Sequence, residues 1–486
     1  MNKNRGRGVQ ALLICMAALS LSGCGGGSSG ATVTSRSSPP CTACSVGGTV
    51  SGLGANESVV LLNNGGNQLS VTSNGTFAFS TREAASGAYD VTVQSHTPGI
   101  ACSVSNGSGV IDTSNEANVA VLCTTGTETV IHSFAGDSTD GQYPAGLVID
   151  GAGDLYGVTA GGGAYGSGTV FKVSATGQVS ILYSFRGGTT DGTNPLAGLV
   201  MDSAGNLYGV TSPGGANGNG TVFKISPSGT EAILYSFANG VYPNGGLVMD
   251  SAGNLYGTTE RGGANDDGAV FKINPNGTGA ILYSFANVAT NGAFPAPGLI
   301  MDSVGNLYGT TTGGGANSGD GTVFKVSPTG TETVLHFFAG GTADGTNPMS
   351  GLVTDSAGNL YGTTFGGGAY GLGTVFKISP AGAETVLHSF AGGTIDGSNF
   401  GHLAGGPLLV DGVGNIYGTT GGGGAYGSGT VFKISPTGAE TVLYSFGGSS
   451  NDGQAPQSLI SDSAGNLYGT TAGGGAYGLG TVFEIN

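Results

Sequence analysis

Tryptophan is absent from this chain of 486 residues, and positive charge is scarce, because lysine and arginine number only 13 against 29 acidic residues. The formal net charge of −16 argues against a nucleic-acid partner, since binding to phosphate backbones relies on clustered cations. Without tryptophan, any stacking platform for a sugar has to use tyrosine or phenylalanine.

Charged residues of both signs are few as well, at 9% of the chain, whereas hydrophobic residues make up 38%. Disordered chains show the opposite balance, because they are highly charged and poor in apolar residues. The 100 glycines and 17 prolines are therefore expected to form turns in a folded protein.

The chain also lacks an apolar run long enough to cross a bilayer as a helix, and its most apolar segment, residues 11–20, is short. Lys3, Arg5 and Arg7 precede this segment. A basic start followed by a short apolar stretch is typical of a secretory signal peptide, so the sequence predicts export.

The signal segment ends in Leu21-Ser22-Gly23-Cys24, which resembles the lipobox of bacterial lipoproteins. The resemblance implies that residues 1–23 are removed, that Cys24 is lipidated, and that this lipid is the only membrane anchor. Gly25 after the cysteine suggests the outer membrane, with the protein either periplasmic or exposed at the cell surface. An ordinary secretory signal with an unrelated cysteine is the alternative.

Four cysteines remain after the signal and the lipidated residue are set aside, namely Cys41, Cys44, Cys102 and Cys123. Outside the cytoplasm they suggest disulfides, with three possible connectivities. We favour a pair between Cys102 and Cys123, which flank the last two strands expected in one small domain. A redox or metal motif at Cys41-x-x-Cys44 is the alternative.

Two different patterns precede residue 127. Residues 24–40 have no apolar periodicity and predict a flexible tether. Residues 41–123 contain short alternating runs such as Ser58-Val-Val-Leu-Leu62, separated by turn residues. Alternation of period two predicts a small β-sandwich, and the pattern resembles prealbumin-like or immunoglobulin-like spacer modules of bacterial surface proteins.

Residues 127–486 form a tandem repeat of about fifty residues, in which Gly-Asn-Leu-Tyr-Gly is followed by Gly-Thr-Val-Phe-Lys-Ile-Ser. The first core recurs seven times, at Asp154, Asn206, Asn254, Asn306, Asn359, Asn415 and Asn466. Each copy offers four short strands, which is typical of a propeller blade. The last copy stops before its fourth strand, and the segment from Thr127 to Phe134 carries the missing one.

These features predict an all-β chain, in which a small β-sandwich domain precedes a seven-bladed β-propeller closed by an N-terminal strand. The repeat resembles the Gloeo/Verruco (GloVer) tandem repeat of bacterial extracellular proteins, and Gly-Leu-Val-Met-Asp-Ser-Ala-Gly-Asn-Leu-Tyr is similar to NHL-type propeller repeats. The resemblance covers about three-quarters of the chain. It implies a surface propeller and brings no assigned activity or catalytic residue.

An aspartate recurs once per repeat before Ser-Ala-Gly-Asn or a close variant, at Asp150, Asp202, Asp250, Asp302, Asp355, Asp411 and Asp462. A single carboxylate per blade on separate hairpins does not supply the converging oxygen ligands that calcium needs. We interpret these residues as turn-forming, because aspartate at the start of a turn accepts hydrogen bonds from backbone amides. No metal site and no cofactor are predicted.

One strand position is filled by His132, His336 and His388 in three repeats and by tyrosine in the other four, at Tyr183, Tyr235, Tyr283 and Tyr444. We interpret these residues as interchangeable aromatic packing residues. A catalytic role for the histidines is the alternative.

Propeller topology places two sets of loops on one face, and we predict that ligands bind there. The candidate residues are Asp140, Asp191, Asp344, Asp396 and Asp452 of the first set, Tyr165, Tyr370, Tyr426 and Tyr477 of the second, and His402 in a lengthened loop. Asparagine replaces the tyrosine in repeats two to four. Differences between copies favour binding over folding, although neutral drift of exposed loops is an alternative.

The predicted function is a membrane-anchored, non-catalytic module that binds a glycan, peptide or envelope protein, acting as a monomer. One alternative is a propeller hydrolase or lyase that uses His402 with Asp396 or Glu260 as acid and base. Another alternative is a scaffold for envelope assembly.

Overall fold

The computed structural model describes residues 44–485, apart from residues 55, 85, 112–115, 126, 239, 244, 317–318 and 399–406. Every helix or strand found among these residues is a β-strand, which confirms the all-β expectation. No helix in this part of the chain is long and apolar enough to span a bilayer. The predicted signal peptide, Cys24 with its tether, Cys41 and His402 lie outside the described residues.

Two four-stranded sheets make up the N-terminal module, in the orders β4-β1-β8-β6 and β3-β2-β5-β7. Alternating apolar residues from both sheets, such as Val59, Leu61, Phe77 and Phe79, belong to one buried cluster. The first sheet comprises β1 (Cys44–Ser51), β4 (Gly75–Glu83), β6 (Ile100–Ser105) and β8 (Glu116–Thr125); the second comprises β2 (Val59–Asn63), β3 (Asn67–Val71), β5 (Ala88–His96) and β7 (Ser108–Val110).

A disulfide joins β6 to β8 in this module. Cys102 and Cys123 lie directly opposite each other in the antiparallel pair, and their sulfur atoms are bonded at 2.06 Å. The favoured pairing is therefore confirmed. Cys44 is disulfide-bonded as well.

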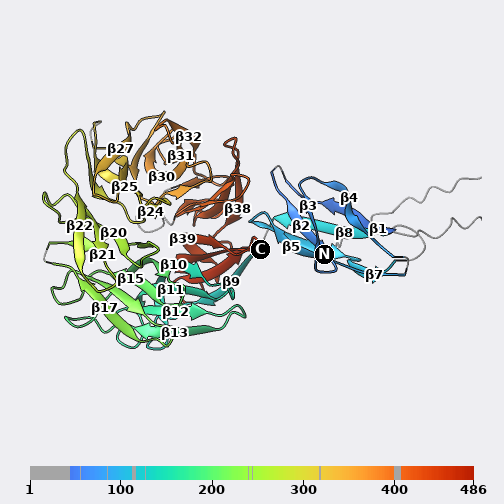
Figure 1. Cartoon of the computed structure of the whole chain (residues 1–486), viewed down its shortest axis with the longest axis horizontal. Helices are drawn as coiled ribbons and strands as arrows, with labels where there is room; N and C mark the ends of the chain where they lie inside the picture. Colours follow the sequence, from blue (N-terminus) through green and yellow to red (C-terminus); the bar gives the residue numbers. More distant parts are fainter. Residues whose placement is uncertain are drawn as a thin grey trace, which may run out of the picture. The chain divides into compact units, whose positions relative to one another are not determined.

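Among the described residues, the repeat region folds into seven antiparallel sheets of four or five strands, which we number repeat sheets 1 to 7 in chain order, and one separate two-stranded pair. Figure 1 shows them following one another around a ring, with β10 and β15 toward its middle and β13, β17 and β22 at its rim. Sheet 1 comprises β10 (Gly141–Ile149), β11 (Leu155–Gly162), β12 (Thr169–Val173) and β13 (Val179–Ser184). Sheet 2 comprises β14 (Pro195–Met201), β15 (Leu207–Thr211), β16 (Thr221–Ile225) and β17 (Glu231–Ser236).

In repeat sheets 3 to 5 the first strand is split into two short pieces that pair with the same neighbour. Sheet 3 comprises β18 (Tyr242–Pro243), β19 (Val248–Met249), β20 (Leu255–Arg261), β21 (Ala269–Ile273) and β22 (Gly279–Ser284). Sheet 4 comprises β23 (Gly292–Pro295), β24 (Ile300–Met301), β25 (Leu307–Gly314), β26 (Thr322–Val326) and β27 (Glu332–Phe337). Sheet 5 comprises β28 (Gly345–Pro348), β29 (Val353–Thr354), β30 (Leu360–Gly367), β31 (Thr374–Ile378) and β32 (Glu384–Ser389).

The last two repeat sheets differ in how they are completed. Sheet 6 comprises β34 (Leu409–Val410), β35 (Ile416–Thr420), β37 (Thr430–Ile434) and β38 (Glu440–Ser445), with the pair β33 (Gly397–Ser398) and β36 (Gly422–Gly423) beside it. Sheet 7 comprises β39 (Gly453–Ser461), β40 (Leu467–Gly474), β41 (Thr481–Ile485) and β9 (Glu128–Ser133). Strand β9 pairs antiparallel with β41, so one sheet contains both the first and the last strand of the repeat region.

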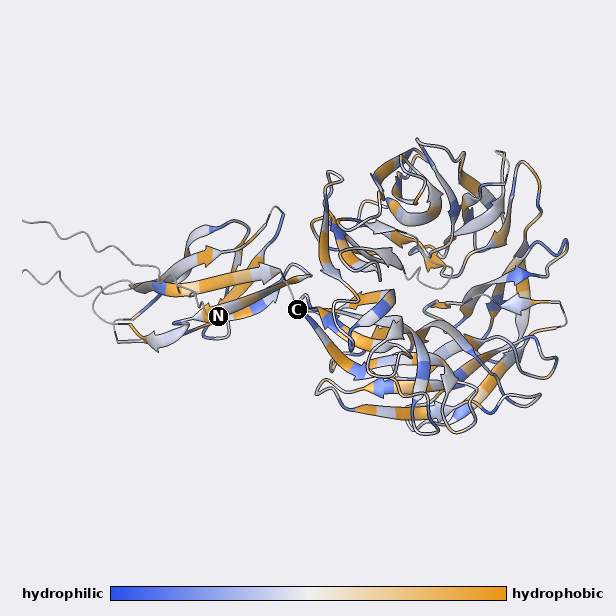
Figure 2. Ribbon diagram, turned by 180° about the vertical axis from the view of Figure 1, so that it is seen from behind, coloured by the Kyte–Doolittle hydropathy of each residue, from blue (hydrophilic) through white to orange (hydrophobic). Residues whose placement is uncertain are grey.

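A buried phenylalanine and a glycine face each other across the two middle strands of every repeat sheet. In sheet 1, a Cβ atom on Gly157 would lie 2.5 Å from the ring of Phe171, so only glycine leaves room for the ring. The glycine of Leu-Tyr-Gly is thus required by close packing. Figure 2 shows hydrophobic residues concentrated along the strands, which is where these rings lie.

Neighbouring repeat sheets contact each other through a second phenylalanine at the end of the outermost strand. Phe285 of sheet 3 packs against Phe324 of sheet 4 with ring centroids 5.0 Å apart. The same edge-to-face contact occurs at every junction, in Phe134–Phe171, Phe185–Phe223, Phe237–Phe271, Phe285–Phe324, Phe338–Phe376, Phe390–Phe432 and Phe446–Phe483. Phe134 follows β9, so its contact with Phe171 joins sheet 7 to sheet 1.

The repeated aspartate forms a turn between the first two strands of each sheet, as predicted. Asp202 Oδ1 accepts hydrogen bonds from the backbone amides of Ala204 and Asn206, both at 2.9 Å. Its Oδ2 accepts the Tyr208 hydroxyl at 2.9 Å. Both carboxylate oxygens are therefore engaged within the turn.

We expect Phe134→Ala and Phe285→Ala to destabilise the protein equally, by about 3–5 kcal/mol each, because each deletes a fully buried ring at a sheet junction. Thermal or urea unfolding of both variants checks this. Phe285 is the matched control, since its sheet has no strand from the start of the repeat region. A near-native Phe134→Ala variant would show that β9 does not hold sheet 7 against sheet 1.

Candidate functional site

The loops between second and third strands contact the segments that enter the next sheet. The amide of Asn194 donates to the carbonyl of Ser167 at 2.9 Å, and the amide of Ala455 donates to the carbonyl of Ser428 at 2.9 Å. Antiparallel connections place both sets of loops at the same end of the sheets. We call this end the loop face.

The donors of these hydrogen bonds have an unusual backbone conformation. Asn194, Asn347 and Ala455 have φ values of 51°, 57° and 51°, in the left-handed region that residues with a Cβ atom seldom adopt. This conformation is stabilised by the hydrogen bond that each amide makes to the preceding sheet's loop. The loops of neighbouring sheets are therefore connected through residues whose backbone conformation is energetically unfavourable.

The five candidate aspartates lie beneath the loop face. Asp191, for example, accepts the amide of Arg186 at 2.7 Å, the amide of Gly192 at 2.6 Å and the hydroxyl of Tyr183 at 2.9 Å. The others accept backbone amides in the same way, at Asp140, Asp344, Asp396 and Asp452. They were predicted as candidate residues of a ligand-binding loop face, and in the structure their carboxylates accept hydrogen bonds from the loop backbone.

The four candidate tyrosines, in contrast, project from the tips of the loops. Their exposed fractions are 55% for Tyr165, 64% for Tyr370, 61% for Tyr426 and 63% for Tyr477. The guanidinium of Arg186 lies 5.4 Å from the centre of the Tyr165 ring. We call these four residues the tyrosine set.

The asparagines that replace tyrosine in repeats two and three make hydrogen bonds within their own sheets. Asn217 and Asn265 donate to the carbonyls of Phe237 and Phe285 at 3.0 and 2.9 Å. Asn317, the third replacement, lies outside the described residues. The tyrosine set belongs to repeat sheets 5, 6, 7 and 1, which follow one another because Phe134 packs on Phe171.

In repeat three, charged residues at the loop between β20 and β21 contact neighbouring side chains or backbone amides. Arg261 lies 3.9 Å from Asp266 and stacks over Phe294 at 5.3 Å, while Asp267 accepts the amide of Asn287 at 2.9 Å. His402, the remaining candidate, lies outside the described residues, so its role stays a prediction.

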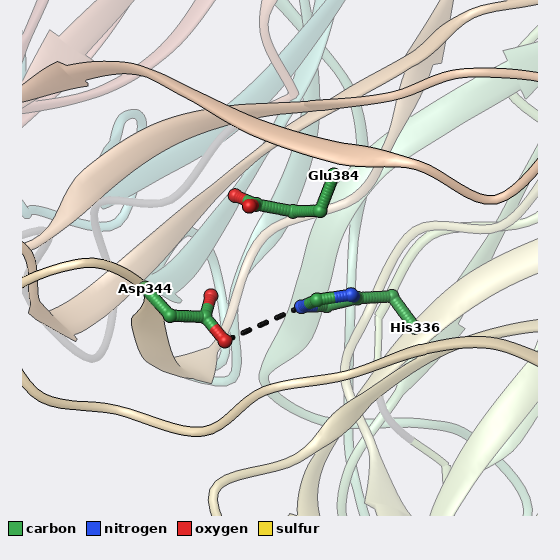
Figure 3. A group of neighbouring side chains, drawn as sticks. All are labelled: His336, Asp344 and Glu384. Atoms are coloured by element: carbon green, nitrogen blue, oxygen red, sulfur yellow. Dashed lines mark ion pairs between the residues drawn. The ribbon is translucent and has the colours of Figure 1, made fainter.

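Four of the sheet junctions also bring a glutamate to a candidate aspartate, and this residue was missed in the sequence. Figure 3 shows His336 of β27, Asp344 of the following loop and Glu384 of β32 converging on one another. His336 Nε2 is 3.4 Å from Asp344 Oδ2, and one ligand atom from each residue lies within 4.8 Å of the others. Such a group could hold a metal ion.

The next junction repeats this arrangement with His388, Asp396 and Glu440. His388 Nε2 is 3.3 Å from Asp396 Oδ2, and Asp396 is buried. The glutamate was hard to recognise because its partners belong to the preceding repeat. A signal existed, since glutamate opens the same strand at Glu128, Glu231, Glu332, Glu384 and Glu440.

Burial raises the pKa of these glutamates. The pKa of Glu128 rises from 4.5 to about 7, through burial and the charge of Asp452, and that of Glu231 rises to about 7 through burial and Asp191. Burial acts the same way on Asp344, but hydrogen bonds from His336 and the amides of Ala339 and Gly345 outweigh it and lower its pKa.

A cleft of about 760 Å³ opens between sheets 1 and 2 at the end opposite the loop face. Its polar groups are paired with neighbouring side chains, since Tyr156 donates to Asp150 at 3.0 Å and Lys172 lies 2.6 Å from Asp154. The loop face is therefore the stronger candidate site.

Comparison with known proteins identifies a repeat family. The model of the Gloeobacter/Verrucomicrobia repeat matches residues 104–319 and 298–486. Curated protein sequences contain no match to this chain.

Two solved propeller-type structures are similar to the chain. A streptogramin B lyase superposes with a TM-score of 0.49 and 14% identity, covering 74% of this chain and 97% of its own. Virginiamycin B lyase from Staphylococcus aureus superposes with a TM-score of 0.48 and 12% identity, covering 74% and 98%. At such low identity, the activities in these names belong to those proteins alone.

We expect Glu128→Gln and Glu231→Gln to stabilise the protein above neutral pH. A native pKa of about 7, above the ordinary 4.5, means that the folded state binds the proton more tightly. Stability should therefore fall as pH rises through this window, and neutral glutamine removes that loss. At about pH 8 each variant should gain roughly 1–3 kcal/mol, and at about pH 4 nothing.

Thermal unfolding across this pH range measures the effect. The exposed Glu260→Gln serves as the control and should show no pH-dependent gain. Equal behaviour of Glu128→Gln and Glu260→Gln would disprove the raised pKa at the junction formed with Asp452 and Tyr444.

Proposed function

The chain belongs to the Gloeobacter/Verrucomicrobia repeat family, and on this premise we propose that it is an exported module that binds a glycan on its loop face without catalysing a reaction. The observation that carries the proposal is the tyrosine set, four exposed rings on consecutive sheets. An aromatic ring offers an apolar face to the C–H groups of a sugar, and tyrosine is the largest ring available in a chain without tryptophan.

The repeat region, in this proposal, is a closed seven-bladed propeller. Support comes from the pairing of β9 with β41 and from the Phe134–Phe171 contact between the first and last sheets. Closure removes two unpaired sheet edges, which would otherwise promote aggregation. It also makes the tyrosine set a continuous arc across repeat sheets 5, 6, 7 and 1.

The N-terminal segments, in the same proposal, deliver this propeller to the cell envelope. A lipid on Cys24 anchors the chain at the outer membrane, residues 24–40 act as a tether, and the β-sandwich acts as a spacer. The lipobox at Leu21-Ser22-Gly23-Cys24 and the disulfide between Cys102 and Cys123 support an extracytoplasmic location.

Two features favour glycan binding over catalysis. Asp396, the predicted acid or base, is already engaged by the amides of Ala391 and Gly397 and by His388. The rings of the tyrosine set, in contrast, project into solvent, and Arg186 lies over one of them, Tyr165. The rings also lie on separate loops of separate sheets, which suits a chain of sugars better than the continuous apolar core of a protein interface.

We expect the combined variant Tyr165→Ser, Tyr370→Ser, Tyr426→Ser and Tyr477→Ser to lose at least about tenfold in glycan affinity. The reason is that stacking on each ring contributes on the order of 0.5–1.5 kcal/mol, and about 1.4 kcal/mol corresponds to a factor of ten. A glycan array identifies the ligand, and titration calorimetry with that ligand measures the loss.

The control replaces two exposed apolar residues at the opposite end of the sheets, Val304→Ser and Val413→Ser, and should bind as the native chain does. If the native chain binds no glycan on the array but co-purifies with an envelope protein, the scaffold alternative would replace this proposal. Equal glycan affinity of the tyrosine variant and the control would show that the tyrosine set does not contribute to binding.

We expect Cys24→Ser to move the protein from the membrane fraction to the soluble fraction of the cell envelope, because a lipid on this residue is the proposed anchor. Fractionation followed by immunoblotting measures the distribution. Retention of the variant in the membrane fraction would contradict lipid anchoring at Cys24.

A further inference from the structure

The two His–Asp–Glu clusters at consecutive sheet junctions have the composition of metal sites. His336, Asp344 and Glu384 form the first cluster, and His388, Asp396 and Glu440 form the second. Each supplies one imidazole nitrogen and two carboxylates from three separate segments of chain. We propose that each cluster binds one divalent transition-metal ion of the zinc class, so that two ions link repeat sheets 4, 5 and 6.

The spacing of the ligand atoms supports this proposal. Two ligands about 2.0–2.1 Å from a tetrahedral zinc ion lie about 3.3 Å apart. His336 Nε2 and Asp344 Oδ2 are 3.4 Å apart, and His388 Nε2 and Asp396 Oδ2 are 3.3 Å apart. The glutamate atoms lie within 4.8 Å of the other two, so a small side-chain movement completes three-point coordination.

Buried polar atoms at these clusters have no hydrogen-bond partner. They are Oε1 of Glu384 and Oε1 of Glu440, and the same atom is unpartnered in Glu128, Glu231 and Glu332 at other junctions. A buried polar atom without a partner is costly, and a metal ion would satisfy it. Only Glu384 and Glu440 combine this unpartnered oxygen with a histidine and an aspartate among the described residues.

Charge favours a cation at both junctions. Asp396 is buried, and its carboxylate lies within 4.8 Å of that of Glu440. A dication neutralises the charge of two carboxylates held so close together. The imidazole ligand favours zinc and its neighbours over calcium or magnesium, which prefer oxygen ligands alone.

The other junctions lack at least one of the three ligands and serve as internal comparisons. His132 and Asp140 form an ion pair at 3.1 Å, but Val179 stands where the third ligand would be. Tyr183 and Tyr444 stand in place of histidine at the junctions of Glu231 and Glu128, and each donates to its aspartate. Among the described residues, therefore, two junctions combine all three ligand types.

Strand β32 contributes to both clusters, through Glu384 to the first and His388 to the second. Asp344 and Asp396 lie in the loops that begin sheets 5 and 6, which carry Tyr370 and Tyr426. Metal ions at these places would therefore rigidify the sheets beneath two members of the tyrosine set. Metal binding does not depend on the proposed glycan, and the two proposals can fail separately.

The test measures zinc in the full-length protein after removal of metal and dialysis against zinc chloride. We expect two zinc ions per native chain, one in each of the variants His336→Tyr and His388→Tyr, and none in the double variant. Tyrosine is the matched replacement, because sister repeats carry it at the same position and fold around it. Zinc should raise the unfolding temperature of the native chain and leave that of the double variant unchanged.

Two further variants separate coordination from folding. His132→Tyr makes the same substitution at a junction without the glutamate and should still bind two ions. Glu384→Gln with Glu440→Gln keeps both histidines and should lower zinc affinity at least about tenfold, the equivalent of about 1.4 kcal/mol. A native chain that takes up no zinc, or a double histidine variant that takes up as much as the native chain, overturns the proposal.

Discussion

Packing of one phenylalanine against the next sheet is the interaction on which the rest of the repeat region depends. Every junction contains an edge-to-face pair between the residue ending an outermost strand and the buried ring of the following sheet. A four-stranded sheet exposes an apolar face that cannot be buried within the sheet itself, so each one is completed by its neighbour. Phe134 comes before sheet 1 in the sequence, but the strand that it follows, β9, belongs to sheet 7. Its contact with Phe171 therefore joins the two ends of the repeat region.

This packing brings polar groups together as a consequence. The strand that carries the phenylalanine also carries histidine or tyrosine two residues earlier, and the following loop returns an aspartate to it at 2.9 to 3.4 Å. The glutamate of the next sheet then approaches both, in a space that water enters poorly. The shifted pKa values of these carboxylates arise from how the sheets stack, and the aspartates among them accept hydrogen bonds from loop amides. A few departures from the repeated pattern, such as the combination of histidine with glutamate, change what the same geometry can bind.

Differences between copies are therefore the best guide to function in this protein. The aspartates are shared because every loop needs them, whereas exposed tyrosine and the His–Asp–Glu combination occur in only some repeats. Both differences overlap in space, since repeat sheets 5 and 6 carry Tyr370 and Tyr426 on the loop face and the two clusters at their junctions. The proposed recognition surface and the proposed metal sites thus lie in one part of the molecule.

The sequence by itself determined the all-β class, the repeat and its four short strands and the turn role of the repeated aspartates, because alternation, turn residues and spacing act over short distances. It favoured the Cys102–Cys123 pair among three connectivities, and the structure decided for it. It also marked Tyr165, Tyr370, Tyr426 and Tyr477 as a distinct group. Only the tertiary structure decided that the candidate aspartates are covered by their loops, and that Glu384 and Glu440 meet His336 and His388 of the preceding repeats. Those contacts depend on how one sheet stacks on the next, and this stacking cannot be predicted from the spacing of residues within a single repeat.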